Sequence, residues 1–360
     1  MSKTGIIWSD RFTEFFFSPK DLWPVWLRRM RRFKELIDSL GLSSFVDIVE
    51  ASRCSDDDVL MLAHSKEYVE YLRSSSRRGF GVLDYGDTIV YERILDDVLL
   101  VVGSAIKGLE LLMKEKYEVI YQPFGGLHHA RRDAAAGFCP VNDIAITIEY
   151  ARRYYGVDRV AVVDIDVHHG DGTQQIFYRD PSVLTISLHM RAPYFYPGTG
   201  DVGEVGEGEG RGYSINVPLP PGTGDEGYRL AFNSVVPKAL RRYEPKLLIA
   251  QLGVDGHKDD LLGGLRLTVN TYLYVASLLR TLSKELGIPL LAFGGGGYGY
   301  RSSEAMVACI LGLIRDEVPS NEFTRMWNAI KEDETKDSKD IIESIERVLK
   351  MLREVVEILR

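Results

Sequence analysis

Five apolar runs in this chain each end in histidine, aspartate or glycine residues, and this pattern limits the possible folds more than any other feature. The runs are rich in β-branched residues and alternate with segments of helical periodicity, so they predict buried strands separated by helices. Strands that are apolar on both faces indicate a parallel sheet with helices on both sides. Such a sheet binds ligands beyond the carboxyl ends of its strands, which is where the polar residues of this chain gather. The runs are 119–121, 160–163, 183–188, 247–252 and 289–293.

The segments around these strands complete an α/β pattern. A glycine-rich segment at 198–212 carries several carboxylates and no lysine, so we expect a mobile acidic loop at a rim rather than a phosphate-binding loop. Residues 5–8 predict a further short strand. Helices are predicted over 67–73, 91–116, 143–155, 226–243 and 268–286.

The bulk composition is that of a large globular protein. The 360 residues are 45% hydrophobic, which is enough for one large core or two smaller ones. The net charge of −8 argues against a nucleic-acid partner. Four arginines within 28–32 are a local exception, but the same predicted helix carries Trp26 and Phe33 on its other side. We therefore interpret the arginines as a solvated helix face.

Cysteine usage and hydropathy predict a soluble, cytoplasmic protein without a membrane partner. The three cysteines are far apart and form no CxxC pair, which fits a reduced compartment. The first residues contain no long apolar segment of the secretory kind. The longest apolar stretch, 98–113, is interrupted by glycine and by charged residues, so it is too polar for a membrane span.

The stretch VDIDVHHGDG, residues 163–172, predicts a metal centre. In extended chain, alternate side chains share a face, so Asp164, Asp166 and His168 should lie together. Two carboxylates and an imidazole suit a divalent metal, and a hydrolytic site of the zinc type needs three protein ligands with an open position for water. Asp166 and His168 supply two ligands, and Asp255, alone at the end of its own strand, supplies the third.

Acid–base groups follow two other strands. Five of the seven histidines lie at strand ends, including the tandem His128 and His129. These two imidazoles provide proton-transfer groups, and Asp164 and Asp171 are the carboxylates available to orient them. Tyr298 follows four glycines and can bring a phenol to a developing oxyanion.

These motifs, in this order, resemble the histone deacetylase superfamily, which includes bacterial and archaeal acetoin-utilisation-type deacetylases. The resemblance extends from about residue 5 to residue 313. It implies the three-layer arginase–deacetylase fold, with a mainly parallel central sheet and helices on both faces. The matching motifs are GGLHHA at 125–130, GFC at 137–139, VDIDVHHGDG at 163–172, SLH at 187–189, PGTGD at 197–201, LGVD at 252–255 and GGGGY at 294–298.

The resemblance implies hydrolysis of the amide of an acetylated, or short-chain acylated, lysine. It implies zinc at Asp166, His168 and Asp255, although the same ligands also suit Fe²⁺. His129, backed by Asp171, would be the main general base and acid. His128, backed by Asp164, would assist electrostatically. Tyr298 would hydrogen-bond the scissile carbonyl.

The resemblance also implies a narrow substrate tunnel and structural potassium ions. Asp87 would hold the substrate backbone at the rim. The tunnel walls would be Gly137, Phe138 and Tyr196, with Leu262 nearby. One potassium site would use Asp164, Asp166, His168, Ser187 and Leu188, and a second would use Phe177, Asp180, Val183 and Tyr213.

Two departures from the family pattern concern the substrate. Tyr196 stands where the family usually has a second phenylalanine, so a hydroxyl enters an apolar channel. Polyamine-specialised relatives carry an acidic residue at the position of Leu262, and its absence favours acyl-lysine over acetylpolyamines or other small acylated amines. A non-catalytic acyl-lysine binder and an arginase-like hydrolase with two manganese ions are the alternatives from other classes.

The carboxy-terminal segment lies outside the resemblance. We predict a deacetylase catalytic domain at 1–317, followed at 318–360 by a charged spacer and an amphipathic helix. Apolar residues recur in this helix with alternating gaps of four and three, which is a heptad seam. The seam predicts either a helix docked on the protein's own body or a contact that forms a homo-oligomer.

Overall fold

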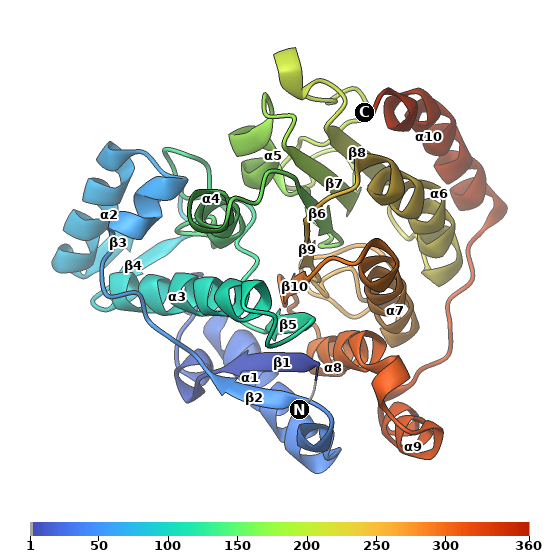
Figure 1. The fold of residues 1–360 in the computed structure, drawn as a ribbon, viewed down its shortest axis with the longest axis horizontal. Helices are drawn as coiled ribbons and strands as arrows, with labels where there is room; N and C mark the ends of the chain where they lie inside the picture. Colours follow the sequence, from blue (N-terminus) through green and yellow to red (C-terminus); the bar gives the residue numbers. More distant parts are fainter. Residues whose placement is uncertain (1–2, 360) are drawn as a thin grey trace.

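The computed structural model describes residues 3–359, and an eight-stranded, entirely parallel sheet runs through its centre (Figure 1). The strand order is β2-β1-β5-β10-β9-β6-β7-β8, and β3 and β4 form a separate antiparallel pair. The strands are β1 Thr4–Trp8, β2 Asp47–Glu50, β3 Phe80–Val82, β4 Ile89–Tyr91, β5 Val119–Gln122, β6 Val160–Asp164, β7 Val183–Met190, β8 Ser214–Leu219, β9 Leu247–Gln251 and β10 Leu290–Phe293.

Helices cover both faces of this sheet, which confirms the predicted three-layer α/β fold. In Figure 1, α3 and α4 lie along one face, and α6 and α7 lie along the other. All residues of β5, β6, β9 and β10 are buried, as expected for strands covered on both sides. The helices are α1 Trp23–Ser39, α2 Lys66–Arg78, α3 Ile94–Met113, α4 Asp143–Tyr155, α5 Asp171–Phe177, α6 Asp225–Tyr243, α7 Val269–Leu286, α8 Ser302–Leu313, α9 Ser320–Ile330 and α10 Lys339–Ile358.

Local capping explains why the predicted helices begin and end where they do. The Asn142 side chain accepts a hydrogen bond from the Ala145 N–H at the start of α4, and Gly156 ends that helix in the left-handed region. Thr268 caps α7 in the same way, and Gly287 ends it. The predicted 91–116 helix is shorter than expected, because its first residue belongs to β4.

The segment 198–212 makes hydrogen bonds to the body of the protein at several points, and its mobility remains a prediction. The carbonyl of Gly200 accepts a hydrogen bond from His189 Nε2 at 2.9 Å. The carboxylate of Glu204 accepts from the Gly200 N–H at 2.8 Å and from Gln174 Nε2 at 2.9 Å. A side chain at Gly206, where φ is +92°, would collide with the Gly210 carbonyl.

The arginine cluster on α1 is also different from the prediction. Arg28, Arg31 and Arg32 are exposed, but Arg29 is only 2% exposed and points into the protein. Its guanidinium contacts the Trp26 ring and donates to backbone carbonyls of the loop after β10.

The carboxy-terminal helix packs on the protein's own body. Its seam residues Ile345 and Leu352 are buried, and α10 runs alongside α6 (Figure 1). The seam is therefore covered within the chain, and a contact between copies would need another surface of α10. The predicted boundary near residue 317 remains a prediction.

Residues 331–338, which we call the strap, connect α9 to α10. The strap contacts the amino terminus of α6, where Asp337 accepts hydrogen bonds from the Gly224 and Gly227 N–H groups at 2.6 and 2.8 Å. Thr335 also hydrogen-bonds the buried carboxylate of Asp225. Within residues 3–359, no helix combines the length and the apolar character that a membrane span requires.

Candidate metal centre and active site

A cavity of about 370 Å³ opens at the carboxyl ends of the four central strands. Because β5, β10, β9 and β6 are neighbours in the sheet, the segments that follow them meet at one edge. The convergence predicted from the sequence is therefore present. The cavity is lined by aromatic rings and by polar side chains, including Phe16, Phe138, Phe195, Tyr196, His128, His129, Asp166, His168, Asp255 and Tyr298.

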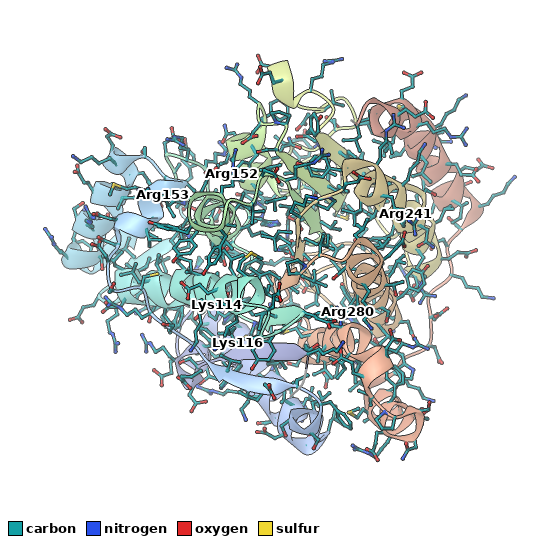
Figure 2. The ribbon with its side chains drawn as sticks, viewed as in Figure 1. Lys114, Lys116, Arg152, Arg153, Arg241 and Arg280 are labelled. Carbon is teal, nitrogen blue, oxygen red and sulfur yellow. The ribbon has the colours of Figure 1, made fainter. Side chains whose placement is uncertain are left out.

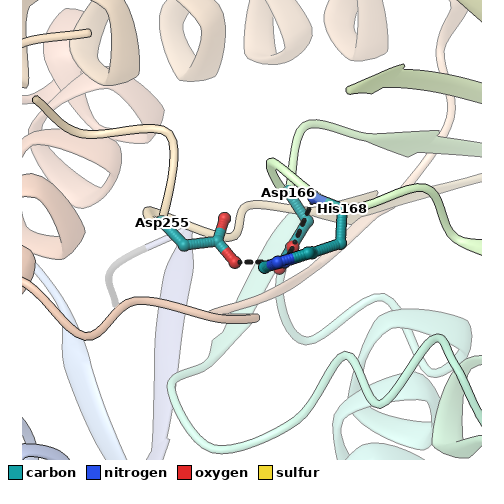
Figure 3. A group of neighbouring side chains, drawn as sticks. All are labelled: Asp166, His168 and Asp255. Carbon is teal, nitrogen blue, oxygen red and sulfur yellow. Dashed lines mark hydrogen bonds and ion pairs between the residues drawn. The ribbon is translucent and has the colours of Figure 1, made fainter. Parts of the chain in front are cut away.

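The three predicted ligands of the divalent metal lie close together (Figure 3), and all three line this cavity. His168 Nδ1 lies 3.2 Å from Asp166 Oδ1 and 3.1 Å from Asp255 Oδ2. Within the described residues, only one other group of three such side chains is close enough to hold an ion, the acidic run 56–58. That run has two exposed members, and Asp57 and Asp58 are paired with Arg73.

The other oxygens of the two carboxylates are held by donors from the protein. Asp166 Oδ2 accepts hydrogen bonds from Gln251 Nε2 and from the Gly296 N–H, both at 2.9 Å. Asp255 Oδ1 accepts from the Val167 N–H at 2.7 Å. One oxygen of each carboxylate therefore faces His168 Nδ1, with its position fixed from behind. This donor set and its support fit a divalent cation.

The electrostatics of the three side chains also fit a cation. Burial, reinforced by the nearby Asp166 charge, raises the pKa of Asp255 to about 8. Burial opposes ionisation of Asp166 too, but the His128 and His168 imidazoles hold its pKa well below the usual value. Burial disfavours the charged form of His168, yet hydrogen bonds and charge from Asp166 and Asp255 raise its pKa to about 10. The two buried carboxylates lie close together, and a bound cation would balance their negative charge. His168 would bind that cation as the neutral imidazole.

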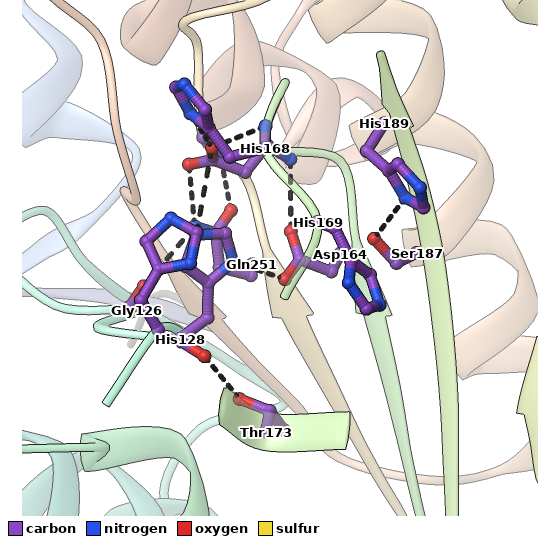
Figure 4. Close-up of polar contacts among 12 residues, drawn as sticks. Gly126, His128, Asp164, His168, His169, Thr173, Ser187, His189 and Gln251 are labelled. Atoms are coloured by element: carbon purple, nitrogen blue, oxygen red, sulfur yellow. Dashed lines mark hydrogen bonds and ion pairs between the residues drawn. The ribbon is translucent and has the colours of Figure 1, made fainter. Parts of the chain in front are cut away.

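The tandem histidines each contact one of the predicted carboxylates. His128 Nδ1 lies 2.6 Å from Asp164 Oδ2 (Figure 4), and His129 Nδ1 lies 2.7 Å from Asp171 Oδ1. The two Nε2 atoms are 3.0 Å apart on the cavity side. Both rings are therefore oriented through Nδ1, and both present Nε2 to the place where a substrate would react.

The two histidines differ in their proton affinity. Burial lowers the pKa of His128, but the charges of Asp164 and Asp166 outweigh it and raise the pKa to about 9. Burial and the neighbouring His128 lower the pKa of His129 to about 4, against the opposing effect of Asp171. Burial alone would raise the pKa of Asp171, but His129 and Arg131 bring it down to about 2.

The loop that carries the tandem histidines is fixed by a buried carboxylate. Asp143, the first residue of α4, accepts hydrogen bonds from the Gly126 and Leu127 N–H groups at 3.0 and 2.7 Å. Burial raises the pKa of Asp143 to about 6, although these donors oppose the shift. The His128 carbonyl accepts from the Thr173 N–H at 3.0 Å. The loop is thus held from both sides.

Tyr298 lies in the cavity wall at the end of the glycine-rich loop. It is 6% exposed, and its ring lies near those of Phe16, Trp26 and Phe138. Burial raises its pKa well above 10, so the phenol keeps its proton and can donate it to a hydrogen bond. A side chain at Gly296 would reach within 2.4 Å of Asp255 Oδ2, so glycine is required for this close approach.

Arg29 and Asp260 hold the glycine-rich loop, and neither was predicted to do so. Arg29 donates to the carbonyls of Gly294 at 2.9 Å and Gly295 at 3.0 Å, and burial lowers its pKa. Asp260 Oδ2 accepts from the Tyr298 N–H at 2.5 Å. Burial raises the pKa of Asp260 to about 6, although hydrogen bonds from backbone N–H groups, that of Tyr298 among them, oppose the shift.

The predicted tunnel residues line the outer part of the cavity. The Phe138 and Tyr298 ring centroids are 6.0 Å apart, and those of Tyr196 and His129 are 4.9 Å apart. A side chain at Gly137 would lie 2.6 Å from His129 and 2.9 Å from the Tyr196 hydroxyl. The tunnel is therefore narrow at this point. Leu262 and the exposed Asp87 are also among the lining residues.

Phe195 completes the tunnel wall and was missed in the sequence. Its ring stacks on that of His168 with centroids 5.0 Å apart and an interplanar angle of 5°. The neighbouring Tyr196 is the wall residue that the family resemblance implied. Three aromatic residues are consecutive at 194–196, and their order alone does not separate the wall residues from the exposed Tyr194.

The residues of the two predicted potassium sites have partners within the protein. Ser187 is opposite Asp164 in the β6–β7 register, and its hydroxyl hydrogen-bonds His189 Nδ1 at 2.9 Å. In the second group, the Asp180 carboxylate accepts from Ser182 and from Arg152, which is labelled in Figure 2. The carbonyl of Phe177 accepts from the Asp180 N–H, that of Asp180 from the Val183 N–H, and that of Tyr213 from the Thr185 N–H. Both potassium sites stay predictions.

Two further histidines form a separate cluster behind β6. His169 Nδ1 hydrogen-bonds the Thr199 hydroxyl at 2.8 Å, and its ring lies 4.8 Å from that of His189 (Figure 4). His189 Nε2 donates to the Gly200 carbonyl. Of the strand-end histidines, His128, His129 and His168 line the cavity, whereas His169 and His189 hold the loop at 199–200.

Comparisons with known proteins agree with this geometry. The model of the histone deacetylase domain matches residues 24–313. A probable deacetylase of Archaeoglobus fulgidus is 32% identical over 96% of this chain and 97% of its own length. Histone deacetylase B of Dictyostelium discoideum is 32% identical over 87% of this chain and 75% of its own length, and human histone deacetylase 1 is 32% identical over 83% and 63%. The chain belongs to the histone deacetylase family.

Proposed function

We propose that this protein hydrolyses the amide of ε-acetylated or short-chain acylated lysine. Family membership supports a deacetylase, and the choice of lysine as the substrate is our proposal beyond it. The observation that carries the proposal is that Asp166, His168 and Asp255 lie in the same cavity as two histidine–carboxylate pairs and a protonated tyrosine. These are the parts that metal-assisted amide hydrolysis requires.

Zinc is the metal that we propose for the three-ligand group, with Fe²⁺ as the other candidate that the ligand types allow. When bound, the cation would polarise the substrate carbonyl and acidify water. Its three protein ligands would leave an open position, as hydrolytic sites of this kind have.

The proposed acid–base steps follow from the two histidine environments. His129 is neutral near pH 7 because its pKa is lowered to about 4, so its Nε2 can accept a proton from the attacking water. The same nitrogen then gives the proton to the leaving amine. Asp171 would fix the ring by accepting a hydrogen bond from the Nδ1–H group. His128 stays charged because its pKa is raised to about 9, and it stabilises the negative charge that develops beside it.

Tyr298 would donate its hydroxyl proton into a hydrogen bond with the carbonyl oxygen as that oxygen gains negative charge. Its high pKa supports this role, because a phenolate could not donate. Arg29 and Asp260 would keep the tyrosine in reach by holding the loop on both sides of it.

The tunnel supports a slender substrate. Phe138 and Tyr196 would contact the apolar stem of the lysine on opposite sides, next to Gly137, and Asp87 would accept hydrogen bonds from the substrate backbone. Leu262 would contribute apolar surface at the mouth, which favours lysine over a charged polyamine. The Tyr196 hydroxyl favours the second candidate, a small acylated amine that offers a polar group to it. A cytoplasmic location and structural potassium complete the proposal.

A substrate panel tests this function. The purified full-length chain, loaded with Zn²⁺ or with Fe²⁺, is given acetyl-lysine peptides, acetylpolyamines and short acylated metabolites, and acetate release is measured. We expect the highest kcat/KM on acetyl-lysine peptides, and no release by Asp166→Ala that remains folded. Inactivity on the whole panel with both metals would refute the proposal, and a preference for free amines would favour the second candidate.

A further inference from the structure

The strap at 331–338 contacts the active-site loop as well as helix α6. Glu332 is the contact residue, and its side chain is 7% exposed. Its Oε2 lies 2.8 Å from His257 Nε2, and its Oε1 lies 2.9 Å from Lys258 Nζ. The Val269 N–H at the start of α7 also donates to Glu332 at 3.3 Å. A carboxylate in a charged connecting segment is thus buried and fully engaged.

His257 transmits this contact to the loop that holds the site. The residue follows Asp255 by two positions, and its side chain is fully buried. Its Nδ1 lies 2.5 Å from Asp259 Oδ1. Asp259 in turn packs against Gly299, where a side chain would come within 2.5 Å of the same carboxylate. Gly299 directly follows Tyr298.

The next residue of the loop reaches the other side of Tyr298. Asp260 accepts from the Tyr298 N–H, and its Oδ1 accepts from the Leu262 and Gly263 N–H groups at 2.8 and 3.1 Å. One short loop, 255–263, therefore carries a proposed metal ligand, a tunnel residue and two carboxylates, Asp259 and Asp260, that lie beside Gly299 and Tyr298. The strap holds this loop through His257.

We infer that Glu332 is a positioning residue of the active site, acting through His257 on Asp255 and Tyr298. The inference rests on the proposed function and adds a part that lies outside the matched region 24–313. The strap also caps α6, but the Glu332 contact is made to a different part of the protein. Without Glu332, His257 loses a buried partner and the loop can shift. Small displacements of this kind reduce kcat when the bound substrate itself is held elsewhere.

The chain offers matched control positions on the same strap. Asp337→Ala removes the cap of α6 and leaves the Glu332 contact in place. Glu334→Ala removes an exposed ion pair with Arg229. If the strap acts only as a general brace, Asp337→Ala should affect the site as much as any change at Glu332 does.

The experiment compares Glu332→Ala, Glu332→Gln, Asp337→Ala and Glu334→Ala in the full-length protein. For Glu332→Ala we expect kcat on an acetyl-lysine peptide to fall about tenfold with KM unchanged, and the Zn²⁺ dissociation constant, measured by competition with a chromophoric chelator, to rise about tenfold. Glu332→Gln keeps the shape of the side chain, so its kcat and its Zn²⁺ affinity should lie between those of Glu332→Ala and the wild type. Asp337→Ala should lower the unfolding temperature but keep kcat and Zn²⁺ affinity.

Two results would overturn the inference. One is a Glu332→Ala protein with kcat and Zn²⁺ affinity of the wild type, and the other is an equal loss in Asp337→Ala. If Glu332→Ala does not fold, the same criteria apply to Glu332→Gln. Failure of the proposed function is separate, because it appears as a wild-type protein without turnover, and the Zn²⁺ affinities then still decide the role of Glu332.

Discussion

His128 and His129 are neighbours in the sequence and each contacts a carboxylate through Nδ1, yet their surroundings differ. His128 faces Asp164 and also lies 3.8 Å from Asp166 Oδ1, so it sits in an excess of negative charge. His129 faces Asp171, whose other oxygen is engaged by Arg131 at 3.1 Å. The pKa is raised to about 9 in His128 and lowered to about 4 in His129.

This difference shows that a histidine–aspartate pair can either hold a proton or accept one, depending on the other charged groups near it. The carboxylates of Asp164 and Asp166 raise the pKa of His128, against the effect of burial. For His129, the neighbouring imidazolium opposes a second positive charge, and Arg131 shares the carboxylate that would otherwise stabilise one. Two pairs built from the same residue types can thus serve as electrostatic support and as base.

The largest expected effect comes from His129→Ala. Loss of the proposed base should reduce kcat on an acetyl-lysine peptide by about 10²- to 10⁴-fold, with bound Zn²⁺ retained. Acetate release measures the rate, and metal analysis of the purified variant checks the site. Comparable activity in His129→Ala and wild type would remove His129 from the mechanism.

Asp171→Asn should have the next largest effect. The neutral amide is a weaker acceptor for the His129 Nδ1–H group and cannot stabilise the protonated imidazole as the carboxylate does. The proposed base therefore loses its orientation, and kcat should fall about 10- to 100-fold. Circular dichroism of the variant controls for folding. A loss larger than that of His129→Ala would mean that Asp171 acts on more than this ring.

His128→Asn should reduce kcat less than His129→Ala does, because electrostatic support is lost while the base remains. We expect about a tenfold loss, which corresponds to about 1.4 kcal/mol in activation free energy. The comparison is made on one peptide at one pH. If His128→Asn proves the more damaging of the two, the proposed roles of the two histidines must be exchanged.

Arg131→Gln should have the smallest effect of the four substitutions, and the quantity it changes is the free energy of unfolding. Asp171 has a folded-state pKa of about 2, below its ordinary value of 3.8, so its ionised form stabilises the fold above about pH 4 and this contribution is lost as the pH falls towards 2. Without Arg131 the folded-state pKa rises and the contribution shrinks. We expect a loss of about 0.2–1 kcal/mol in the free energy of unfolding at pH 7, because Arg131 is partly exposed.

Urea unfolding at pH 7 and at pH 3 measures this loss. The difference between Arg131→Gln and wild type should become smaller at the lower pH. Arg132→Gln is the matched control, since Arg132 is an exposed neighbour whose carbonyl accepts a hydrogen bond from the Ser65 N–H. An Arg131 effect that grows at pH 3 would contradict the assignment.

Most of the central sheet could be predicted because its strands are uniform in character. The five apolar runs correspond to β5, β6, β7, β9 and β10, with ends that differ by at most two residues. The edge strand β8 was missed, since it contains Asn216 and Pro218 and lacks a continuous apolar run. Helix α8 was also missed, because nearly all its residues are buried and no polar face marks a helical period.

The side chains that face the cavity could be predicted more completely than those that support them. Asp166, His168 and Asp255 lie in conspicuous strand-end motifs, and they do converge. Arg29 was misread as a solvated residue, although it shares a helix face with Trp26, Met30 and Phe33, and that spacing was the available signal. The role of Glu332 depends on where a distant segment folds back, which local pattern does not contain.

The order of strands in the sheet has a consequence for synthesis of the protein. The neighbours β6 and β9 carry ligands that are far apart in the sequence, and β10, which leads to Tyr298, inserts between β9 and the earlier β5. A growing chain that has reached residue 200 therefore has two of the three proposed metal ligands and a sheet with a gap at its centre. If these residues bind a metal as proposed, the ion would be captured only after nearly the whole catalytic region has left the ribosome, and a bound ion would report that β9 and β10 have joined the sheet.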